Sequence, residues 1–155
     1  MSNIKTMKKT TKTKNLVIPV KVLAADAKFP VKAHATDACY DLFALKTTRI
    51  VGHGFITVGT GVAFNIPVGY FGKIYERSGV SLQRPFAIKA GVIDAGYTGE
   101  INIIIHNHGF MPEIIDAGTK IAQIAIHELP ETELIQVTEF ENTERGEKGF
   151  GSSGT

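Results

Sequence analysis

The C-terminal residues 145–155, RGEKGFGSSGT, combine residue types that can bind a phosphate group. The glycines let backbone N–H groups approach an anion closely, and the serine hydroxyls add further donors. Arg145 offers a guanidinium fork that fits a phosphate. Phe150 stands alone among small residues, which suits stacking on a base. A flexible, solvated chain end has the same composition, so the composition alone leaves both interpretations open.

A second candidate phosphate site lies at 75–82, YERSGVSL. A strand pattern ends at Glu76, and Arg77, Ser78 and Gly79 then open a turn or a short helix. A cation, a hydroxyl and free backbone amides at a helix start form a seat for a phosphate. A serine that only caps the helix would explain the same residues.

Asp94 is the candidate general base, within AGVIDAGYTGE at 90–100. It lies between Ile93 and a turn at Gly96, with Tyr97 three residues further on. An aspartate at the tip of a tight hairpin is more often a turn former. It becomes a candidate base if a cleft forms around it.

Two acids near a strand start, Asp37 and Asp41 in ATDACYDLFA at 35–44, could hold a magnesium ion through water. Mg²⁺ prefers oxygen ligands and keeps part of its hydration shell. The alternative is one capping aspartate and one solvated aspartate. Gln123 is a lone amide within an apolar strand pattern, so it is either a structural hydrogen bonder or a ligand contact.

Other catalytic and metal motifs are not found in the sequence. His106 and His108 share a strand face, but no third ligand stands nearby and Cys39 is isolated, so we do not expect zinc. Cys39 has no evident histidine partner and is expected to be a small buried side chain. The sequence contains neither a phosphate-binding GxxxxGK[ST] loop nor a GxSxG elbow.

The segments that must position these residues are short and apolar, and many of them alternate with polar residues. They occur at 16–23, 40–45, 47–51, 55–67, 70–76, 101–107, 120–129 and 134–140. Turn residues separate them, and this spacing predicts an all-β sandwich or barrel. The stretch 78–86 could form a turn or two of helix before Pro85.

The chain of 155 residues suits one domain, and its single cysteine rules out a disulfide within the chain. Residues 1–14 carry five lysines and no acid, whereas the other 141 residues carry a net charge of −3. This leader lacks the apolar region of a secretory signal. We expect a disordered basic leader, and a weak nucleic-acid or nuclear-import patch is the alternative. No apolar run is long enough to span a membrane.

Five segments carry a resemblance by their order: ATDACYDLFA, ERSGVSL, AGVIDAGYTGE, GTKIAQIAI and RGEKGFGSSGT. Together they resemble the five motifs of the homotrimeric deoxyuridine triphosphatases (dUTPases), and the resemblance runs from about Asn15 to Thr155. It implies a distorted jelly-roll-like β-barrel or sandwich with a mobile C-terminal arm. The expected parts are the leader at 1–14, a β domain at 15–140 and the arm at 141–155.

The resemblance also implies hydrolysis of dUTP to dUMP and pyrophosphate with Mg²⁺. This activity would keep uracil out of DNA and supply dUMP for thymidylate synthesis. In the family, three subunits share their active sites, and the arm of a third chain closes each site. A cytoplasmic location follows, with nuclear or host-cell locations as alternatives, and neither a membrane nor stable nucleic-acid binding is expected.

Residue by residue, the resemblance makes Asp94 the base that orients and deprotonates the attacking water. Asp41 would hold magnesium through the waters bound to the ion. The residues expected to contact the phosphate chain are Arg77, Ser78, Gly79 and Gln123. Gly91 and its neighbours would read uracil through backbone groups, and Tyr97 would pack under the deoxyribose. In the arm, Phe150 would stack on uracil, and the other binding residues would be Arg145, Gly151, Ser152 and Ser153.

The chain departs from the family pattern at four places. Glu76 stands where proline is usual, which puts an acid next to the expected phosphate seat. Cys39 replaces a glycine. Thr98 and Lys120 each replace a common arginine, and both are expected to be peripheral.

Two other functions stay open. A dCTP deaminase, or a bifunctional deaminase-dUTPase, would share the subunit fold. Such relatives carry a glutamate in the hairpin region and lack the GFGS arm, whereas this chain has Asp94, Tyr97 and the arm. A non-enzymatic β-sandwich interaction module would not need Asp94 and the arm together.

Overall fold

The structure is a computed structural model that describes residues 16–147. The leader at 1–14 and the arm residues Phe150, Gly151, Ser152 and Ser153 lie outside the described residues. Within the described part the elements are β1 (Val20–Val22), β2 (Tyr40–Phe43), β3 (Thr48–Ile50), β4 (Phe55–Phe64), β5 (Tyr70–Tyr75), α1 (Ser78–Gln83), β6 (Phe86–Lys89), β7 (Val92–Ile93), β8 (Glu100–Asn107), β9 (Glu113–Ile115) and β10 (Lys120–Glu128).

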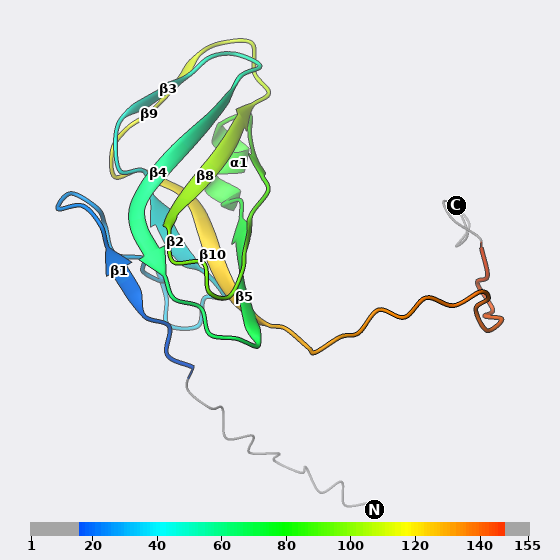
Figure 1. Cartoon of the computed structure of the whole chain (residues 1–155). Coiled ribbons are helices and arrows are strands. Elements are labelled where there is room, and N and C mark those ends of the chain that lie inside the picture. Colours follow the sequence, from blue (N-terminus) through cyan, green and yellow to red (C-terminus); the bar gives the residue numbers. More distant parts are fainter. Residues whose placement is uncertain (1–15, 148–155) are drawn as a thin grey trace, which may run out of the picture.

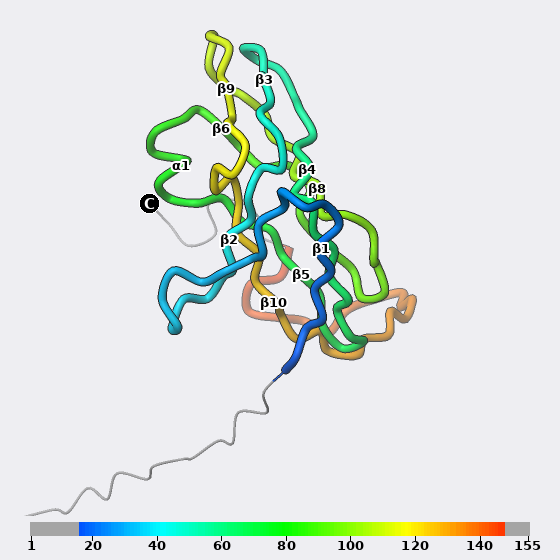
Figure 2. The backbone as a smooth tube through the Cα atoms, turned by 90° about the vertical axis from the view of Figure 1, so that its left-hand side faces the viewer, coloured from blue at the N-terminus to red at the C-terminus, as the bar shows by residue number. Residues whose placement is uncertain are grey.

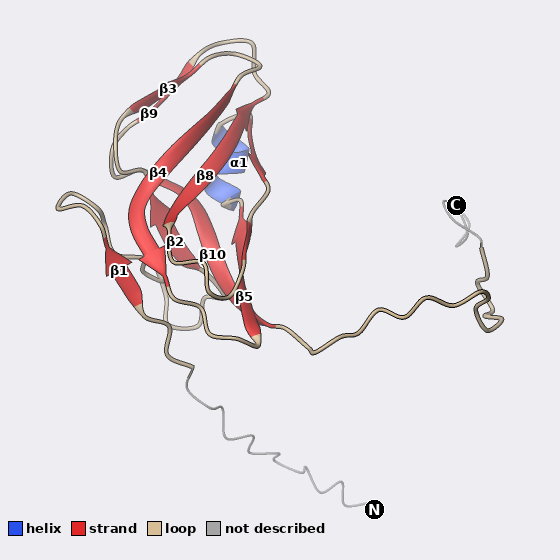
Figure 3. Ribbon diagram, viewed as in Figure 1, coloured by secondary structure: helices blue, strands red, loops and turns tan. Residues whose placement is uncertain are grey.

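The strands form two four-stranded sheets packed face to face (Figures 1 and 3). One sheet has the order β1-β4-β8-β6 and the other β2-β10-β5-β7, with antiparallel neighbours throughout. A ribbon of β3 and β9 extends beyond one end of both sheets (Figure 2). The predicted all-β, jelly-roll-like sandwich is confirmed, and its sheets are not closed into a barrel.

The core lies between the sheets and follows from the alternation of apolar residues. On β8, Ile101, Ile103 and Ile105 are buried, while Asn102 and Ile104 between them face outward. Successive strand residues point to opposite faces, so this alternation covers one side of the sheet with isoleucine. Full burial of each such side chain contributes about 1.5–3 kcal/mol. The core therefore fixes which face of each strand points outward.

The strands predicted between residues 16 and 129 are confirmed as β1, β2, β3, β4, β5, β8 and β10, and the helix expected at 78–86 is α1. Three short strands, β6, β7 and β9, were not predicted. The strand predicted at 134–140 is wrong, because residues 129–147 form no strand and are exposed. They run away from the sandwich (Figure 1). An alternating segment becomes a strand only beside a pairing edge, and this segment lies beside none of the described strands.

No helix in the described part of the chain is long and apolar enough to cross a membrane.

Candidate active site

Four of the predicted site residues meet in one pocket of about 340 Å³. They are Asp41 on β2, Arg77 and Ser78 at the start of α1, and Gln123 on β10. The sheet register explains the meeting, because β10 lies between β2 and β5 and Gln123 pairs with both Asp41 and Tyr75. Since α1 begins three residues after Tyr75, the helix start lies beside the same point of the sheet.

Asp41 is a buried carboxylate held by two cations. The Nε of Arg77 donates to Oδ1 at 2.7 Å, and the ammonium nitrogen of Lys120 lies 2.7 Å from Oδ2. Burial alone would raise the pKa of Asp41, but the contacts with Lys120 and Arg77 outweigh it and lower the pKa below the ordinary 3.8. Asp41 is thus neither solvated nor a cap. Lys120, expected to be peripheral, is a direct partner of this carboxylate.

The start of α1 supplies free backbone donors. Arg77 is the N-cap residue, and its side chain makes no capping hydrogen bond. Ser78 and Gly79 are the first two helical residues, so their N–H groups have no partner within the helix. The alternative in which Ser78 only caps the helix is therefore wrong, because Arg77 is the N-cap and Ser78 lines the pocket.

Gln123 and Glu76 connect this helix start to both sheets. The side-chain amide of Gln123 donates to the backbone carbonyl of Glu76 at 2.7 Å. The Glu76 carboxylate accepts the N–H of Ile88 on β6 at 3.0 Å and does not line the pocket around Asp41. The acid that departs from the family pattern therefore binds a sheet edge instead of facing the phosphate seat.

The two remaining residues of the first motif have different roles. Asp37 accepts the backbone N–H of His34, three residues earlier, at 2.9 Å, so it closes a turn and caps no helix. Cys39 is half-buried and lines the pocket, and burial raises the pKa of its thiol. A raised pKa keeps the thiol protonated near neutral pH and argues against a nucleophile.

Asp94 lies in a separate part of the structure. It follows β7 in one sheet and precedes β8 in the other, so it belongs to a crossing between sheets instead of a hairpin tip. Its carbonyl accepts the N–H of Tyr97 at 3.3 Å, and its side chain is exposed. The Tyr97 hydroxyl donates to the carbonyl of Glu100 at 3.0 Å, which holds the ring over Gly99.

Gly91 lies where the chain passes from β6 to β7. Its φ is +99°, and the preceding Ala90 also has a positive φ of 60°. The carbonyl of Gly91 accepts the N–H of Ile74, and an added Cβ would lie 3.2 Å from the Ile74 carbonyl oxygen. A second pocket, of about 330 Å³, lies here and is lined by Ala90, Ile88, Glu76 and β5 residues.

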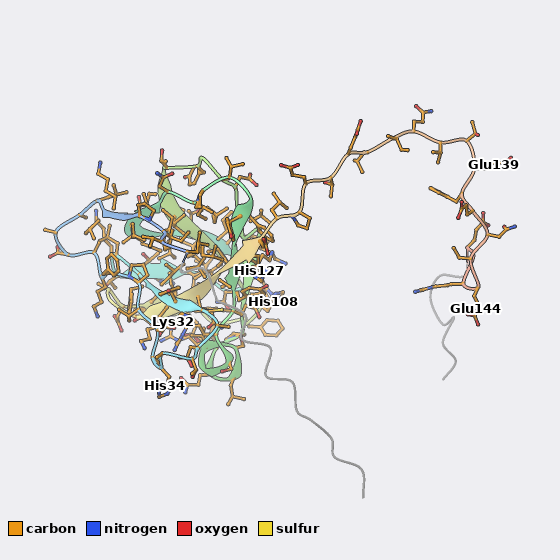
Figure 4. The ribbon with its side chains drawn as sticks, turned by 90° about the horizontal axis from the view of Figure 1, so that it is seen from below. Lys32, His34, His108, His127, Glu139 and Glu144 are labelled. Carbon is orange, nitrogen blue, oxygen red and sulfur yellow. The ribbon has the colours of Figure 1, made fainter. Side chains whose placement is uncertain are left out.

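One chain does not bring all predicted residues into a single pocket. Neither Gly91, Asp94 nor Tyr97 lines the pocket that contains Asp41. Arg145 is exposed, and it lies in a segment that leaves the sandwich, as the positions of Glu139 and Glu144 show (Figure 4). The described part of the chain thus contains the residues around Asp41 and the segment from Gly91 to Tyr97, but these two groups lie apart.

His106 and His108, which share a strand face in the sequence pattern, contact each other. His106 Nδ1 lies 3.1 Å from His108 Nε2, and the His106 ring stacks on Phe55. Among residues 16–147, no group of three His, Cys, Asp or Glu side chains could hold a metal ion.

Comparison with known protein families identifies a match to the dUTPase family over residues 25–154, which includes both pockets. The chain belongs to the dUTPase family. Among its dUTPase relatives, the deoxyuridine 5′-triphosphate nucleotidohydrolase of Kluyveromyces lactis is 37% identical over 138 residues, which are 88% of this chain and 93% of the relative.

Solved dUTPase structures are also similar. The dUTPase of Staphylococcus bacteriophage 80alpha with dUPNHPP has a TM-score of 0.86 and 36% identity, and the match covers 91% of this chain and all of that chain. A mutant dUTPase from phage phi11 of S. aureus, with a structural Mg(II) ion, has a TM-score of 0.77 and 32% identity over 82% of this chain and all of that chain. The predicted dUTPase resemblance is therefore confirmed.

Proposed function

We propose that this chain hydrolyses dUTP to dUMP and pyrophosphate. The observation that carries the proposal is the pocket of Asp41, Arg77, Ser78 and Gln123, in a chain of the dUTPase family. It combines a cation, a hydroxyl and an amide with free backbone N–H groups, which are the donors that a triphosphate requires. The relatives named as dUTP nucleotidohydrolases support this substrate.

The chemical step is attack of water on the α-phosphorus. The Asp94 carboxylate accepts a proton from the water as its oxygen bonds to phosphorus, and the bond from phosphorus to the α–β bridging oxygen breaks. Pyrophosphate leaves with that oxygen. Arg77, Ser78, Gly79 and Gln123 hold the phosphates in line, and Arg145, Ser152 and Ser153 contact the γ-phosphate, with Gly151 among them.

The segment from Gly91 to Tyr97 would recognise the nucleoside. Backbone groups around Gly91 pair with the edge of uracil, and cytosine would leave them unpaired because it has a donor where uracil has an acceptor. Tyr97 packs under the deoxyribose, where its ring leaves no room for a 2′-hydroxyl. The hydrogen bond from Tyr97 to Glu100 supports this role, because it fixes the ring. Phe150 stacks on the base.

The residues present fit a magnesium ion bound through water. Asp41 and Asp37 are the two carboxylates that line the pocket, and both already accept other donors. Such a set cannot form a cage of protein ligands, whereas Mg²⁺ typically keeps waters and binds substrate phosphates. Asp41 would hold the ion through those waters. When bound, magnesium would neutralise charge on the phosphates.

A homotrimer with shared sites accounts for the separation of the two groups. One chain would supply Asp41, Arg77 and Gln123, a second would supply Gly91 to Tyr97, and residues 141–155 of a third would close the site. The exposed course of residues 129–147 supports an arm that leaves its own body. The domain division into a leader at 1–14, a body at 15–140 and this arm belongs to the same proposal, as do a cytoplasmic location and the supply of dUMP.

The alternatives are less well supported. A dCTP deaminase is not favoured, because the named relatives are dUTP nucleotidohydrolases. A non-enzymatic module would not require the two cations on Asp41 or the polar pocket beside them.

The experiment is hydrolysis of dUTP in ¹⁸O-labelled water with mass analysis of both products. Attack on the α-phosphorus places the label in dUMP. Label in pyrophosphate would mean attack on the β-phosphorus and would contradict the proposed mechanism. Omission of Mg²⁺, with a chelator present, is expected to slow turnover without moving the label.

A further inference from the structure

Asp41 has two cationic partners that occupy different positions. Arg77 lines the pocket, and its side chain is 27% exposed. Lys120 also lies 2.7 Å from the carboxylate, but it does not line that pocket. One partner can therefore meet a ligand in the pocket, whereas the other holds Asp41 from outside it.

A buried carboxylate cannot lose all its partners at low cost. Only 9% of the Asp41 side chain is exposed, so a departing cation leaves a carboxylate that is largely shielded from solvent. Removing one member of a buried ion pair leaves an uncompensated charge and is strongly destabilising. If Arg77 were the sole partner of Asp41, its transfer to a phosphate would be opposed by this cost.

The backbone holds Lys120 beside Asp41. Lys120 begins β10 and pairs with Phe43, two residues beyond Asp41 on the neighbouring strand. A register irregularity between Lys120 and Ala122 shifts the lysine relative to the rest of the ladder. The lysine is thus fixed to the strand that carries Asp41, whereas Arg77 sits on a separate short helix start.

We propose that Lys120 is a positioning residue that acts as the permanent counter-ion of Asp41, so that Arg77 can move from Asp41 to the phosphate chain of a ligand. The inference rests on the proposed function, in which this pocket takes the triphosphate. It gives the lysine a role through Asp41 and Arg77, without contact between Lys120 and the ligand.

The test is a double-mutant cycle on ligand affinity. Calorimetry measures binding of dUpNHpp, with a chelator in place of metal, to the full chain and to Lys120→Met, Asp41→Asn and the double variant. Lys120→Met is expected to weaken binding about tenfold when Asp41 is present, because Arg77 stays on the carboxylate. In the Asp41→Asn background, the same change is expected to alter binding less than about twofold. Lys120→Arg keeps the charge and is expected to restore most of the affinity.

Two results would overturn the inference. Equal weakening in both backgrounds would mean that Lys120 acts on the ligand directly, and unchanged affinity in Lys120→Met would mean that Arg77 needs no second cation. If Lys120→Met fails to fold, the double variant is the deciding protein. A double variant that folds and binds the ligand as tightly as Asp41→Asn supports the counter-ion role. A double variant that does not fold contradicts that role. A wild-type chain that turns over dUTP but shows no coupling refutes this inference alone, whereas the absence of turnover refutes the proposed function as well.

Discussion

The side-chain amide of Gln123 on β10 donates a hydrogen bond to the backbone carbonyl of Glu76, the residue before the N-cap of α1, at 2.7 Å. This bond ties an inner strand of one sheet to the residue that precedes the helix. Gln123 thus makes a structural hydrogen bond, and it also lines the pocket that contains Asp41, so the two roles open to it in the sequence do not exclude each other. The bond also orients Arg77, which follows Glu76 directly and reaches back to Asp41.

Gln123→Ala is expected to remove this tie. The loss of one hydrogen bond costs about 0.5–1.5 kcal/mol in unfolding free energy, and a displaced Arg77 would raise the KM for dUTP several-fold. Denaturant unfolding and steady-state kinetics measure the two effects. Gln83→Ala, at the end of α1, is the matched control, because no hydrogen bond of its side chain is found among residues 16–147. Equal effects of the two changes would contradict the role of Gln123.

Asp41 is expected to give the protein an acid-sensitive component of stability. Its pKa is lowered below 3.8 in the folded chain, so the folded state resists protonation more than the unfolded state does. The contribution is complete above the unfolded pKa and is lost as the pH falls through the folded pKa.

Thermal unfolding of the wild type and Asp41→Asn from about pH 2 to pH 7 measures that contribution. The wild type is expected to be more stable near neutral pH, with a gap that narrows below 3.8. A gap that stays constant with pH would show that the ion pairs with Arg77 and Lys120 contribute nothing.

Replacement of Gly91 by alanine is expected to lower the free energy of unfolding strongly. A φ of +99° already penalises any side chain by about 1–2 kcal/mol, and the close Ile74 carbonyl adds a steric term. Gly69→Ala is the matched control, because Gly69 has a φ of +87° but open space around an added Cβ. Denaturant unfolding is expected to show a larger loss for Gly91→Ala than for Gly69→Ala, and equal losses would mean that the contact with Ile74 does not matter.

Deletion of residues 145–155 is expected to lower kcat/KM strongly while the fold persists. The described part of the arm is exposed and contributes little to the core, and closure over a substrate excludes water from the reaction. Unchanged activity in the truncated chain would refute the arm's role.

Phe150→Ala is expected to weaken substrate binding by about 1–3 kcal/mol, because the ring would no longer stack on the base. The control is Phe110→Ala, which replaces an exposed phenylalanine on the body.

The sequence predicted the long apolar strands. β4, β8 and β10 are 10, 8 and 9 residues long, and their apolar patterns define them without further information. β6, β7 and β9 have 4, 2 and 3 residues and lie outside the predicted apolar segments, whereas the equally short β1 and β3 lie within the segments at 16–23 and 47–51. They exist because neighbouring strands offer them hydrogen bonds.

The site was predictable in its residue types but not in its charge pairing. The resemblance to the dUTPase motifs indicated that Asp41, Arg77 and Gln123 belong to one site, and the pocket confirms that these three residues meet. The contact between Lys120 and Asp41 depends on the register of β2 and β10 and on the irregularity after Lys120, which no local pattern reveals. The position of Asp94 in a connection between the two sheets was not predicted for the same reason. The pairing partners of β7 and β8 determine which sheet each strand joins.

The most direct test of the account is pyrophosphate release from dUTP, dCTP, dTTP and UTP by the wild type and by Asp94→Asn. We expect release from dUTP with Mg²⁺, much slower release from the other three, and no ammonia from dCTP. Loss of a general base lowers kcat by about 10²–10⁴-fold, so Asp94→Asn should be nearly inactive while Asp116→Asn, an exposed aspartate outside both pockets, stays active. Ammonia released from dCTP, or turnover of dUTP that is the same with and without Asp94, would contradict the account.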